Sequence, residues 1–370
     1  MREGRYDAIV LGGGPAGAAT ALSLLRRGHT AALVESSGYE TERVGETLAP
    51  PVRSVLEHLG AWEPFAAAGE HLESHATRAS WGADPPGANP FVLSARGHGY
   101  EVDRRRFDEL LAGVARAAGA AVHLRARLTE AERIPEGWKL TIGRADGPAL
   151  RLDAAFVVDA TGRHARFAMA RGARKLVEDR LVAVCGVFDA VGLEHDEAGV
   201  LVEACREGWW YSARLPHERA IVAFLSDADI VTAAGMRSPA RWQAALRSRP
   251  HTLARLDGAT WPSQLVVHGA RTQRLDKVAG PDWLAAGDAA ATVDPLSSQG
   301  ILKALRCGIF ASYAISDRLQ GDGAAFVRYA AFVAGEYADN LAARALHYAG
   351  EDRWPQAPFW RRRRGVPAPA

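Results

Sequence analysis

Lysine, cysteine and long apolar runs are all scarce in this chain of 370 residues. Its three cysteines, Cys185, Cys205 and Cys307, lie far apart and show no C-x-x-C spacing. A fully paired disulfide framework and a zinc ribbon are therefore excluded. No stretch approaches the ~18 uninterrupted apolar residues of a membrane span, and the first residues do not have the pattern of a signal peptide. We expect a cytoplasmic protein without a membrane partner.

A large excess of charge of one sign is missing as well. The 45 lysines and arginines stand against 43 aspartates and glutamates, which gives a formal net charge of +2. This balance excludes a polybasic nucleic-acid binder and a strongly acidic disordered chain. With 48% hydrophobic residues and 37 glycines, the composition is that of a globular protein with one large or two interlocked domains.

The twelve histidines give no spacing that predicts a metal site. His71 and His75 would share one face of a helix, but residues 74–81 have the pattern of a strand, so we predict no bound metal. His98 and His164 are candidates for proton delivery only because no other catalytic acid stands out in the sequence.

What the sequence does contain is a dinucleotide-binding pattern at residues 8–35. An apolar run leads into Gly12, Gly14 and Gly17 in G-x-G-x-x-G spacing, and a helical segment and a second apolar run follow, ending at Glu35. Such glycines permit a tight turn and a close approach of the backbone to a pyrophosphate, while the acid can bind a ribose. The predicted nucleotide-binding residues are Gly12, Gly14, Pro15, Ala16, Gly17, Glu35 and Ser36.

Two later segments have the pattern of further parts of the same site. Residues 156–163 form an apolar run that ends in D-x-T-G, with the carboxylate at Asp159. Residues 283–290 form another, which ends in Gly287 and Asp288, and a helical run begins near Gly300. A carboxylate at the end of a parallel strand can bind a ligand hydroxyl, and a helix start offers backbone N–H groups. No second G-x-G-x-x-G is present, which argues against a separate NAD(P)H domain.

Taken in order, GGGPAG, DATGR and GDAAATVDPLSSQGI resemble the p-hydroxybenzoate-hydroxylase-like flavoproteins, within these the group of geranylgeranyl reductases and flavin-dependent tryptophan halogenases. The resemblance spans residues 5–350 and includes the segments RVGETLAP (43–50) and VDRRRFD (102–108). It implies one FAD. The further FAD contacts that it implies are Arg43, Arg104, Asp159, Gly287, Asp288, Pro295, Ser298, Gly300 and Ile301. The substrate-pocket candidates are Glu46, Trp209, Trp210 and Ser298.

The fold expected from these patterns is α/β, with a Rossmann-like FAD-binding domain, a substrate domain built on a β-sheet and a C-terminal helical segment. We assign residues 1–60, 100–175 and 265–320 to the FAD-binding domain, and 61–99 and 176–264 to the substrate domain. Residues 321–370 should form a C-terminal helix and a basic tail, whose Arg361–Arg364 run either contacts an acidic protein or stays solvated. Strand alternation should put Trp209 and Trp210 on opposite faces, so at most one of them lines the pocket.

Four functions, three of them reactions, remain open at this stage. Halogenation is disfavoured, because the segment from Val52 to Trp138 contains no lysine and because Ser297 stands where tryptophan halogenases have a glutamate. Their W-x-W-x-I-P signature is replaced here by WWYSARLP (209–216). Reduction of a C=C bond, as in geranylgeranyl reductases, needs an apolar tunnel, and the polar residues of segment 203–214 argue against one. A FAD-stabilised chaperone without turnover is the fourth possibility.

Hydroxylation is the reaction that we favour. Segments GWWYSARLP, DPLSSQGI and 353–362 resemble the flavoprotein maturation partners of quinone-cofactor amine and amino-acid oxidases. That resemblance implies a monooxygenase acting on an aromatic ring, a tryptophan or indole, in a small molecule or within a protein or peptide. The reaction would proceed through a flavin C4a-hydroperoxide. NAD(P)H or a separate flavin reductase would supply the electrons.

Overall fold

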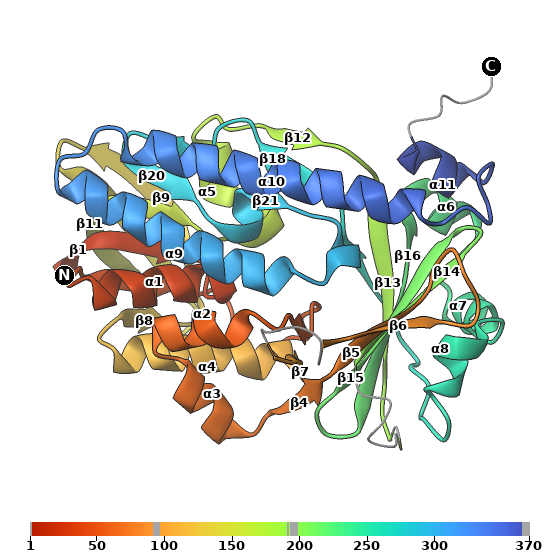
Figure 1. Ribbon diagram of the computed structural model, residues 1–370. Coiled ribbons are helices and arrows are strands. Elements are labelled where there is room, and N and C mark those ends of the chain that lie inside the picture. The colour runs from red at the N-terminus through yellow and green to blue at the C-terminus, as the bar shows by residue number, and fades with distance from the viewer. Residues whose placement is uncertain (1, 92–96, 191, 193–198, 365–370) are drawn as a thin grey trace.

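The computed structural model describes residues 2–91, 97–190, 192 and 199–364 of the chain. Two large sheets dominate it, an eight-stranded one near the N-terminus and a seven-stranded one at the opposite end (Figure 1). Across the described residues, none of the helices combines the length and the apolar composition that crossing a bilayer requires. The α/β fold class is confirmed.

The eight-stranded sheet is built on the apolar runs of the nucleotide-binding pattern. Its central strands are parallel and buried, which explains why they read as continuous apolar segments. The strand order is β19 (Ala279–Gly280), β20 (Trp283–Ala285), β11 (Leu150–Asp159), β1 (Arg2–Leu11), β2 (Ala31–Val34) and β8 (Ala121–His123), and β10 (Gly137–Arg144) and β9 (Ala126–Ile134) extend it from β11.

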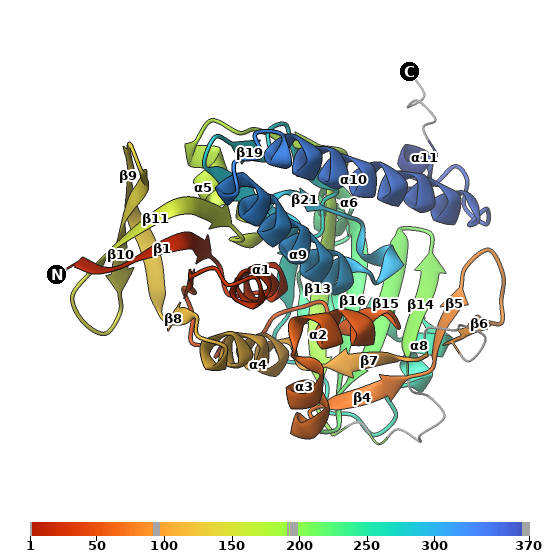
Figure 2. The same ribbon diagram turned by 60° about the vertical axis from the view of Figure 1, so that its left-hand side comes forward.

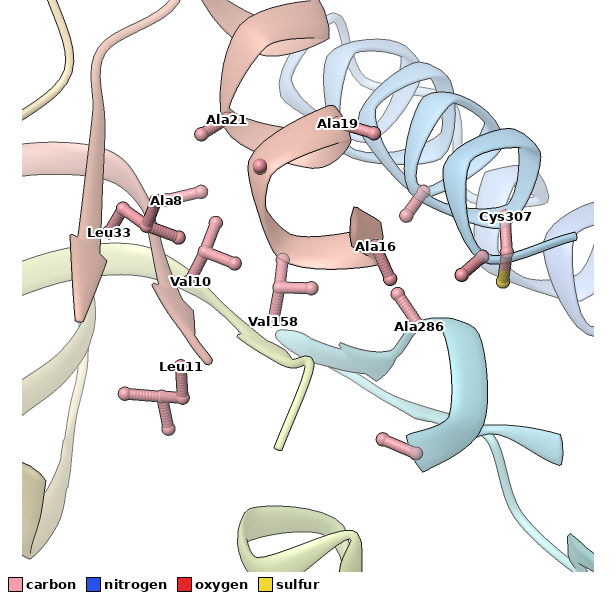
Figure 3. Close-up of a cluster of buried hydrophobic side chains, with 14 of the residues drawn as sticks. Ala8, Val10, Leu11, Ala16, Ala19, Ala21, Leu33, Val158, Ala286 and Cys307 are labelled. Carbon is pink, nitrogen blue, oxygen red and sulfur yellow. The ribbon is translucent and has the colours of Figure 1, made fainter. Parts of the chain in front are cut away.

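Helices stack in layers beside this sheet. Figure 1 shows α10 (Ala325–Ala349), α9 (Gly300–Leu319) and α1 (Pro15–Arg26) one below another; α2 (Val52–Leu59) and α4 (Arg104–Ala117) lie below α1, and α3 (Trp62–Ala68) is at the lower edge. α1 and α9 approach closely because small residues face each other: a Cβ at Gly308 would lie 2.3 Å from the carbonyl oxygen of Ala16. Figure 3 shows Ala16 and Ala19 of α1 beside Cys307 of α9.

The seven-stranded sheet is formed mainly by residues of the segments 61–99 and 176–264. Its order is β17 (Val266–Gly269), β13 (Leu181–Phe188), β16 (Arg219–Asp227), β15 (Gly208–Leu215), β14 (Val200–Cys205), β5 (Ala76–Ser80) and β6 (Gly87–Pro90). One face is covered by α6 (Ala228–Ala233), α7 (Pro239–Leu246) and α8 (Pro250–Ala254). The boundary predicted at residue 265 needs a correction: β17 pairs with β13 in this sheet and does not belong to the FAD-binding layer.

Short sheets connect the two large ones. β3 (Thr47–Leu48), β7 (Gly99–Val102) and β4 (His71–Ser74) form one of them, and β12 (Lys175–Val177), β18 (Gln273–Leu275) and β21 (Ala291–Thr292) form the other. The remaining short elements are α5 (Arg166–Ala170) and three 3₁₀ turns, η2 (Gly162–His164), η4 (Gly287–Ala289) and η5 (Pro295–Ser297). Figure 2 shows β7, which pairs with both β3 and β4, together with β4 near the lower end of the seven-stranded sheet. These strands therefore carry the polypeptide from one large sheet to the other.

The C-terminal region consists of two helices where a helix and a tail were expected. α11 (Pro358–Arg363) buries Phe359 and Trp360 completely against the seven-stranded sheet. The side chain of Arg363 is 2% exposed, and its Nη2 lies 2.9 Å from Asp227 Oδ1. Within the described residues, neither interpretation of the arginine run was therefore right, because Arg362 and Arg363 bind acids of their own chain. Residue 364 is the last described.

This contact predicts a loss of stability in Arg363→Met. Removing the guanidinium leaves the buried Asp227 carboxylate with only the partly exposed Arg362 as a cation. We expect the free energy of unfolding to fall by about 3 kcal/mol, near the lower end of the range for breaking a buried ion pair. Denaturant unfolding measures it. Arg361→Met, which removes a neighbouring arginine with no ion pair among the described residues, should change stability little; equal losses in both variants would contradict the role of Arg363.

Candidate functional site

A cavity of about 1220 Å³ lies between the two large sheets. It exceeds the roughly 300–1,000 Å³ of pockets for drug-sized ligands. It runs from the start of α1 and the end of β2 to the face of the seven-stranded sheet that α7 does not cover. The predicted site residues that line it are Gly12, Gly14, Pro15, Ala16, Glu35, Ser36, Arg43, Glu46, Arg104, Trp209, Asp288, Pro295, Ser298, Gly300 and Ile301.

Four predicted residues do not line the cavity. Asp159 was expected to bind a ligand hydroxyl, but its Oδ1 accepts from the Thr161 amide at 3.0 Å and its Oδ2 accepts from the Ala168 amide at 2.8 Å. Its carboxylate thus stabilises the turn into α5. Trp210 points to the other face of the sheet and packs on Trp242, as strand alternation requires. Gly17 and Gly287 serve close packing instead of cavity lining.

The motif glycines fall into two groups by the space around them. A Cβ at Gly17 would lie 1.9 Å from the carbonyl oxygen of Gly12, and a Cβ at Gly12 would lie 2.2 Å from that of Ala160. The fold itself therefore demands both glycines. A Cβ at Gly14, by contrast, would meet no protein atom closer than 4.0 Å, and Gly14 borders the cavity. A glycine there leaves room for a ligand close to the N-terminus of α1, where a pyrophosphate binds in dinucleotide folds.

A polar network borders this end of the cavity. Glu35 Oε2 accepts from the Gly13 amide at 2.7 Å, and its Oε1 lies 3.1 Å from Arg43 Nη2. Burial raises the pKa of Glu35, but hydrogen bonds from Ser37 and Gly13 and the charge of Arg43 outweigh it and hold the pKa below its usual value. Arg43 also binds the fully buried Asp108 at 2.8 Å. Glu35 is therefore ionised at neutral pH and keeps acceptor capacity toward a ribose.

Asp108 also positions Arg104. The Arg104 guanidinium lies 3.1 Å from Asp108 Oδ2 and donates to the carbonyl oxygens of Val44 and Gly45 at 2.9 and 3.2 Å. Its side chain is 13% exposed, so the residue is held in place and not solvated. Asp108 thus fixes two arginines at the cavity and, through Arg104, the loop that carries Glu46.

The start of α9 also borders the cavity. Ser298 adopts a left-handed conformation with φ of 52°, two residues before α9 begins at Gly300, and Gly300 and Ile301 line the cavity as well. The helix N-terminus carries a partial positive charge that favours an electron-rich group nearby. Asp294 fastens this segment to α10, because its Oδ2 accepts from Tyr348 Oη at 2.9 Å. The C-terminal helix thereby supports the predicted flavin side of the cavity.

The cavity wall also contains a buried acid, Glu46. Glu46 is 3% exposed, and its Oε1 accepts from the Gly45 amide at 2.8 Å. Burial raises the pKa of Glu46 to about 7, against the lowering effects of backbone hydrogen bonds, the charge of Arg104 and the Tyr211 hydroxyl. Trp209 and Tyr211 line the cavity beside it. A carboxyl group that is half protonated at pH 7 within a cavity can act as a general acid.

Sequence reasoning missed several residues of this site. Asp108, Thr47, Tyr211 and Cys185 all belong to it, and Glu101 lies directly behind Thr47. The register of β3 against β7 and the position of β15 bring Thr47, Glu101 and Tyr211 together, and no local pattern predicts this grouping. Residues 126–131 of β9 also line the cavity. Asp108, Thr47 and Tyr211 had a usable signal, since they lie in the segments VDRRRFD, RVGETLAP and GWWYSARLP that carry the resemblance.

The histidine predictions have mixed outcomes. His164 lines the cavity, but burial and the neighbouring cations Lys175, Arg166 and Arg163 lower its pKa, so it is neutral at pH 7. His98 does not line the cavity. It lies instead beside His75 and Glu73, and ligand atoms of these three lie within 4.8 Å of one another, a grouping that could hold a metal ion. This group is exposed and its residues do not border the cavity.

Known proteins resemble the chain over almost its whole length. The model of the FAD binding domain family matches residues 5–324. A putative FAD-dependent oxidoreductase, LodB, of Marinomonas mediterranea is 29% identical over 98% of both chains. Tryptophan 2-halogenase and digeranylgeranylglycerophospholipid reductases are among the other relatives. The predicted resemblance and the FAD cofactor are thereby confirmed.

Two solved structures share the fold. The myxobacterial chondrochloren halogenase CndH superposes with a TM-score of 0.88 at 23% identity, over 98% of this chain and 86% of its own. The peptidyl tryptophan dihydroxylase QhpG, essential for tryptophylquinone cofactor biogenesis, superposes with a TM-score of 0.79 at 25% identity, over 98% and 80%. The space at Gly14 and the lining by Glu35 and the start of α9 fit an FAD in the cavity.

The glycine geometry predicts opposite effects for two similar substitutions. Gly14→Val should leave the fold intact but place its side chain where the ligand approaches, and it should raise the Kd for FAD at least about 100-fold, the equivalent of a clash of about 3 kcal/mol. Gly17→Val should destabilise the protein itself, because its Cβ overlaps the Gly12 carbonyl. Flavin absorbance after gel filtration and thermal unfolding separate the two effects. Retention of FAD by a folded Gly14→Val protein would contradict the assignment.

Proposed function

Because this chain belongs to the FAD binding domain family, we propose that it is an FAD-dependent monooxygenase that oxidises an aromatic ring. Its substrate is a tryptophan or indole, free or within a protein or peptide. The observation that carries the proposal is the protonatable Glu46 in a cavity that Trp209, Tyr211 and the start of α9 also line. The similarity to a peptidyl tryptophan dihydroxylase supports it.

Each part of the cavity has a distinct task in this proposal. The amides at the start of α1 bind the pyrophosphate of FAD, and Glu35 binds its ribose. Reduced FAD supplies the two electrons that activate O₂, after NAD(P)H or a separate flavin reductase has delivered them. The start of α9, with Ser298, holds the flavin side of the cofactor by its N–H groups.

Glu46 supplies a proton to the oxygen atom that leaves as water. The overall reaction converts the aromatic substrate, O₂ and reduced FAD into hydroxylated substrate, water and oxidised FAD. Burial of Glu46 raises its pKa to about 7, so its carboxyl is half protonated at that pH and can give up a proton there. Cys185 borders the same wall, but burial raises the pKa of its thiol far above the usual range, so it is not a nucleophile.

Halogenation is a second candidate. Halogenases of this fold are among the structural neighbours, and Lys175 supplies an ammonium group to the cavity wall. Lys175 lies on β12, beside His164 of the nucleotide-binding half. Lys175 therefore lies on a different sheet from Trp209 and far from it in the sequence, which favours oxygenation over halogenation.

Product masses decide between the two reactions. Reduced holoenzyme is mixed with O₂ and tryptophan, indole or tryptophan-containing peptides, with and without chloride and bromide. We expect mass increases of one or two oxygen atoms in both conditions, and a decrease of about 10²–10⁴-fold in product formation in Glu46→Gln, the usual effect of removing a general acid. A halogenated product that requires the halide would overturn the proposal.

The two adjacent tryptophans provide a matched pair of variants. Trp209 lines the cavity, whereas Trp210 packs behind the sheet against Trp242. Trp209→Leu should therefore raise KM for an aromatic substrate about tenfold, the equivalent of about 1.4 kcal/mol of stacking. Trp210→Leu should lower the thermal stability and leave KM unchanged. Equal KM values in the two variants would show that Trp209 does not contact the substrate.

A further inference from the structure

The small sheet of β3, β7 and β4 carries a group of three side chains that the proposed function does not use. Glu73 lies on β4, His75 directly follows β4, and His98 directly precedes β7. One ligand atom from each of the three lies within 4.8 Å of the other two. None of the three residues borders the large cavity. The group is therefore separate from the site described above.

The pairing of β4 with β7 explains why these residues meet. The strands are antiparallel, with Glu73 opposite Tyr100, so the same register continued by two residues places His75 opposite His98. Alternate residues share one face of a strand, which puts Glu73 and His75 on the same side. The ring centroids of His75 and His98 lie 5.3 Å apart. The sequence predicted no metal site because the spacing of His71 and His75 suits a helix; the partner of His75 comes instead from the opposite strand.

The imidazole rings of His75 and His98 face one carboxylate. His75 Nε2 lies 3.4 Å from Glu73 Oε2, and His98 Nε2 lies 3.4 Å from Glu73 Oε1. Both distances exceed the roughly 2.7–3.2 Å of N–H···O hydrogen bonds. They match the separation of about 3.4 Å between neighbouring ligand atoms at a tetrahedral zinc ion, which follows from bonds of about 2.1 Å. The spacing therefore fits an ion held between the three groups better than it fits hydrogen bonds among them.

The nitrogen atom of His98 that faces the carboxylate lacks a hydrogen bond. This atom, Nε2, is buried and has no hydrogen-bond partner within the described part of the chain. The ring of Tyr100 packs against the His98 ring, with their centroids 5.0 Å apart, and so holds it in this position. A buried polar atom without a partner costs free energy. A metal ion would supply the missing partner, since a neutral imidazole offers a ring nitrogen as a ligand.

The surroundings of Glu73 also favour a cation. Among the described residues, its ion-pair partners are the two histidines alone, so no arginine or lysine competes for its carboxylate. Its side chain is 56% exposed, which leaves room for a hydrated ion to enter. Imidazole ligands suit Zn²⁺ and related transition metals, whereas Mg²⁺ and Ca²⁺ prefer oxygen ligands. The set of two imidazoles and one carboxylate therefore selects a transition metal.

We propose that Glu73, His75 and His98 form a binding site for a divalent transition-metal ion such as Zn²⁺, with water as the fourth ligand. The site does not depend on the proposed function. His75 is the residue between β4 of the small sheet and β5 of the seven-stranded sheet. An ion bound there connects this crossing between the sheets to the start of β7. The role of the metal is therefore to stabilise the fold.

Zinc binding to the flavin-loaded protein, prepared without a histidine tag and freed of metal by a chelator, tests the site. Equilibrium dialysis with metal analysis should find one Zn²⁺ per chain, which excess Mg²⁺ or Ca²⁺ does not displace. Loss of an outer hydrogen-bond partner of a metal ligand costs about 10- to 100-fold in affinity, so removing a ligand in His75→Asn should raise the Kd for Zn²⁺ at least about 100-fold. His75 is 61% exposed, so this change should leave the fold intact.

His217→Asn is the matched control. His217 is also exposed and lies 2.8 Å from one carboxylate, that of Glu70, but it belongs to no three-ligand group among the described residues. Its replacement should leave the Kd for Zn²⁺ unchanged. The three cysteines are buried and do not compete for zinc in the folded protein.

Thermal unfolding measures the stabilising role. A ligand that binds the folded chain raises Tm as its concentration rises, so Zn²⁺ should raise the Tm of the parent and of His217→Asn. The rise should be lost in His75→Asn and reduced in Glu73→Gln, which exchanges the carboxylate for a neutral amide. Equal zinc affinities in the parent and His75→Asn, or a parent that binds no zinc, would overturn the proposal. Failure to oxidise any aromatic compound would overturn the proposed function alone, because neither measurement uses a substrate.

Discussion

The close packing around Ala16 is the constraint on which the site depends. Gly12 and Gly17 touch through their backbones, Gly308 of α9 meets the carbonyl of Ala16, and a Cβ at Gly287 would lie 2.5 Å from the Ala16 side chain. Two segments that are far from α1 in the sequence, those of Gly287 and Gly308, are therefore held against its first turn. Because protein interiors deform little, this contact sets how far the start of α1 lies from Asp288 and from the start of α9.

The buried carboxylate of Asp108 connects the nucleotide-binding residues to the loop that carries Glu46. Asp108 is fully buried and is compensated by Arg43 and Arg104 together. Arg104 in turn holds the carbonyls of Val44 and Gly45, and the next residues along the loop are Glu46 and Thr47. Losing either arginine would leave a charge in the interior that is expensive to bury alone. The acid of the cavity wall is thus placed by the cofactor-binding half of the protein, not by the sheet that it faces.

The sequence predicted those parts of the site that local backbone geometry requires. The glycine motif, the β2 acid and the segment before α9 all line the cavity, since each occupies a turn or a helix start. Asp159 shows the limit: its place at a strand end was predictable, but the turn to α5 captures its carboxylate. Alternation separated Trp209 from Trp210 correctly, yet only the register of the sheet decides which faces the cavity. The prediction for the run Arg361–Arg364 was wrong for a similar reason, because a pattern of charges in the sequence does not show which distant residue, here Asp227, pairs with them.

The raised pKa of Glu46 could not be predicted from the sequence, although Glu46 itself was a pocket candidate, and Glu101 was not found at all, because the chemistry of both acids comes from what is absent around them. At the nucleotide end, Glu35 and Asp108 each have an arginine within 3.1 Å, and the pKa of Glu35 is lowered. At the other end, burial without an ion pair raises the pKa values of Glu46 and Glu101. One cavity therefore combines a charged end that suits a ligand with phosphates and a wall whose buried acid has no ion pair among the described residues. A reaction that consumes a proton beside a bound dinucleotide needs both, and neither follows from residue type alone.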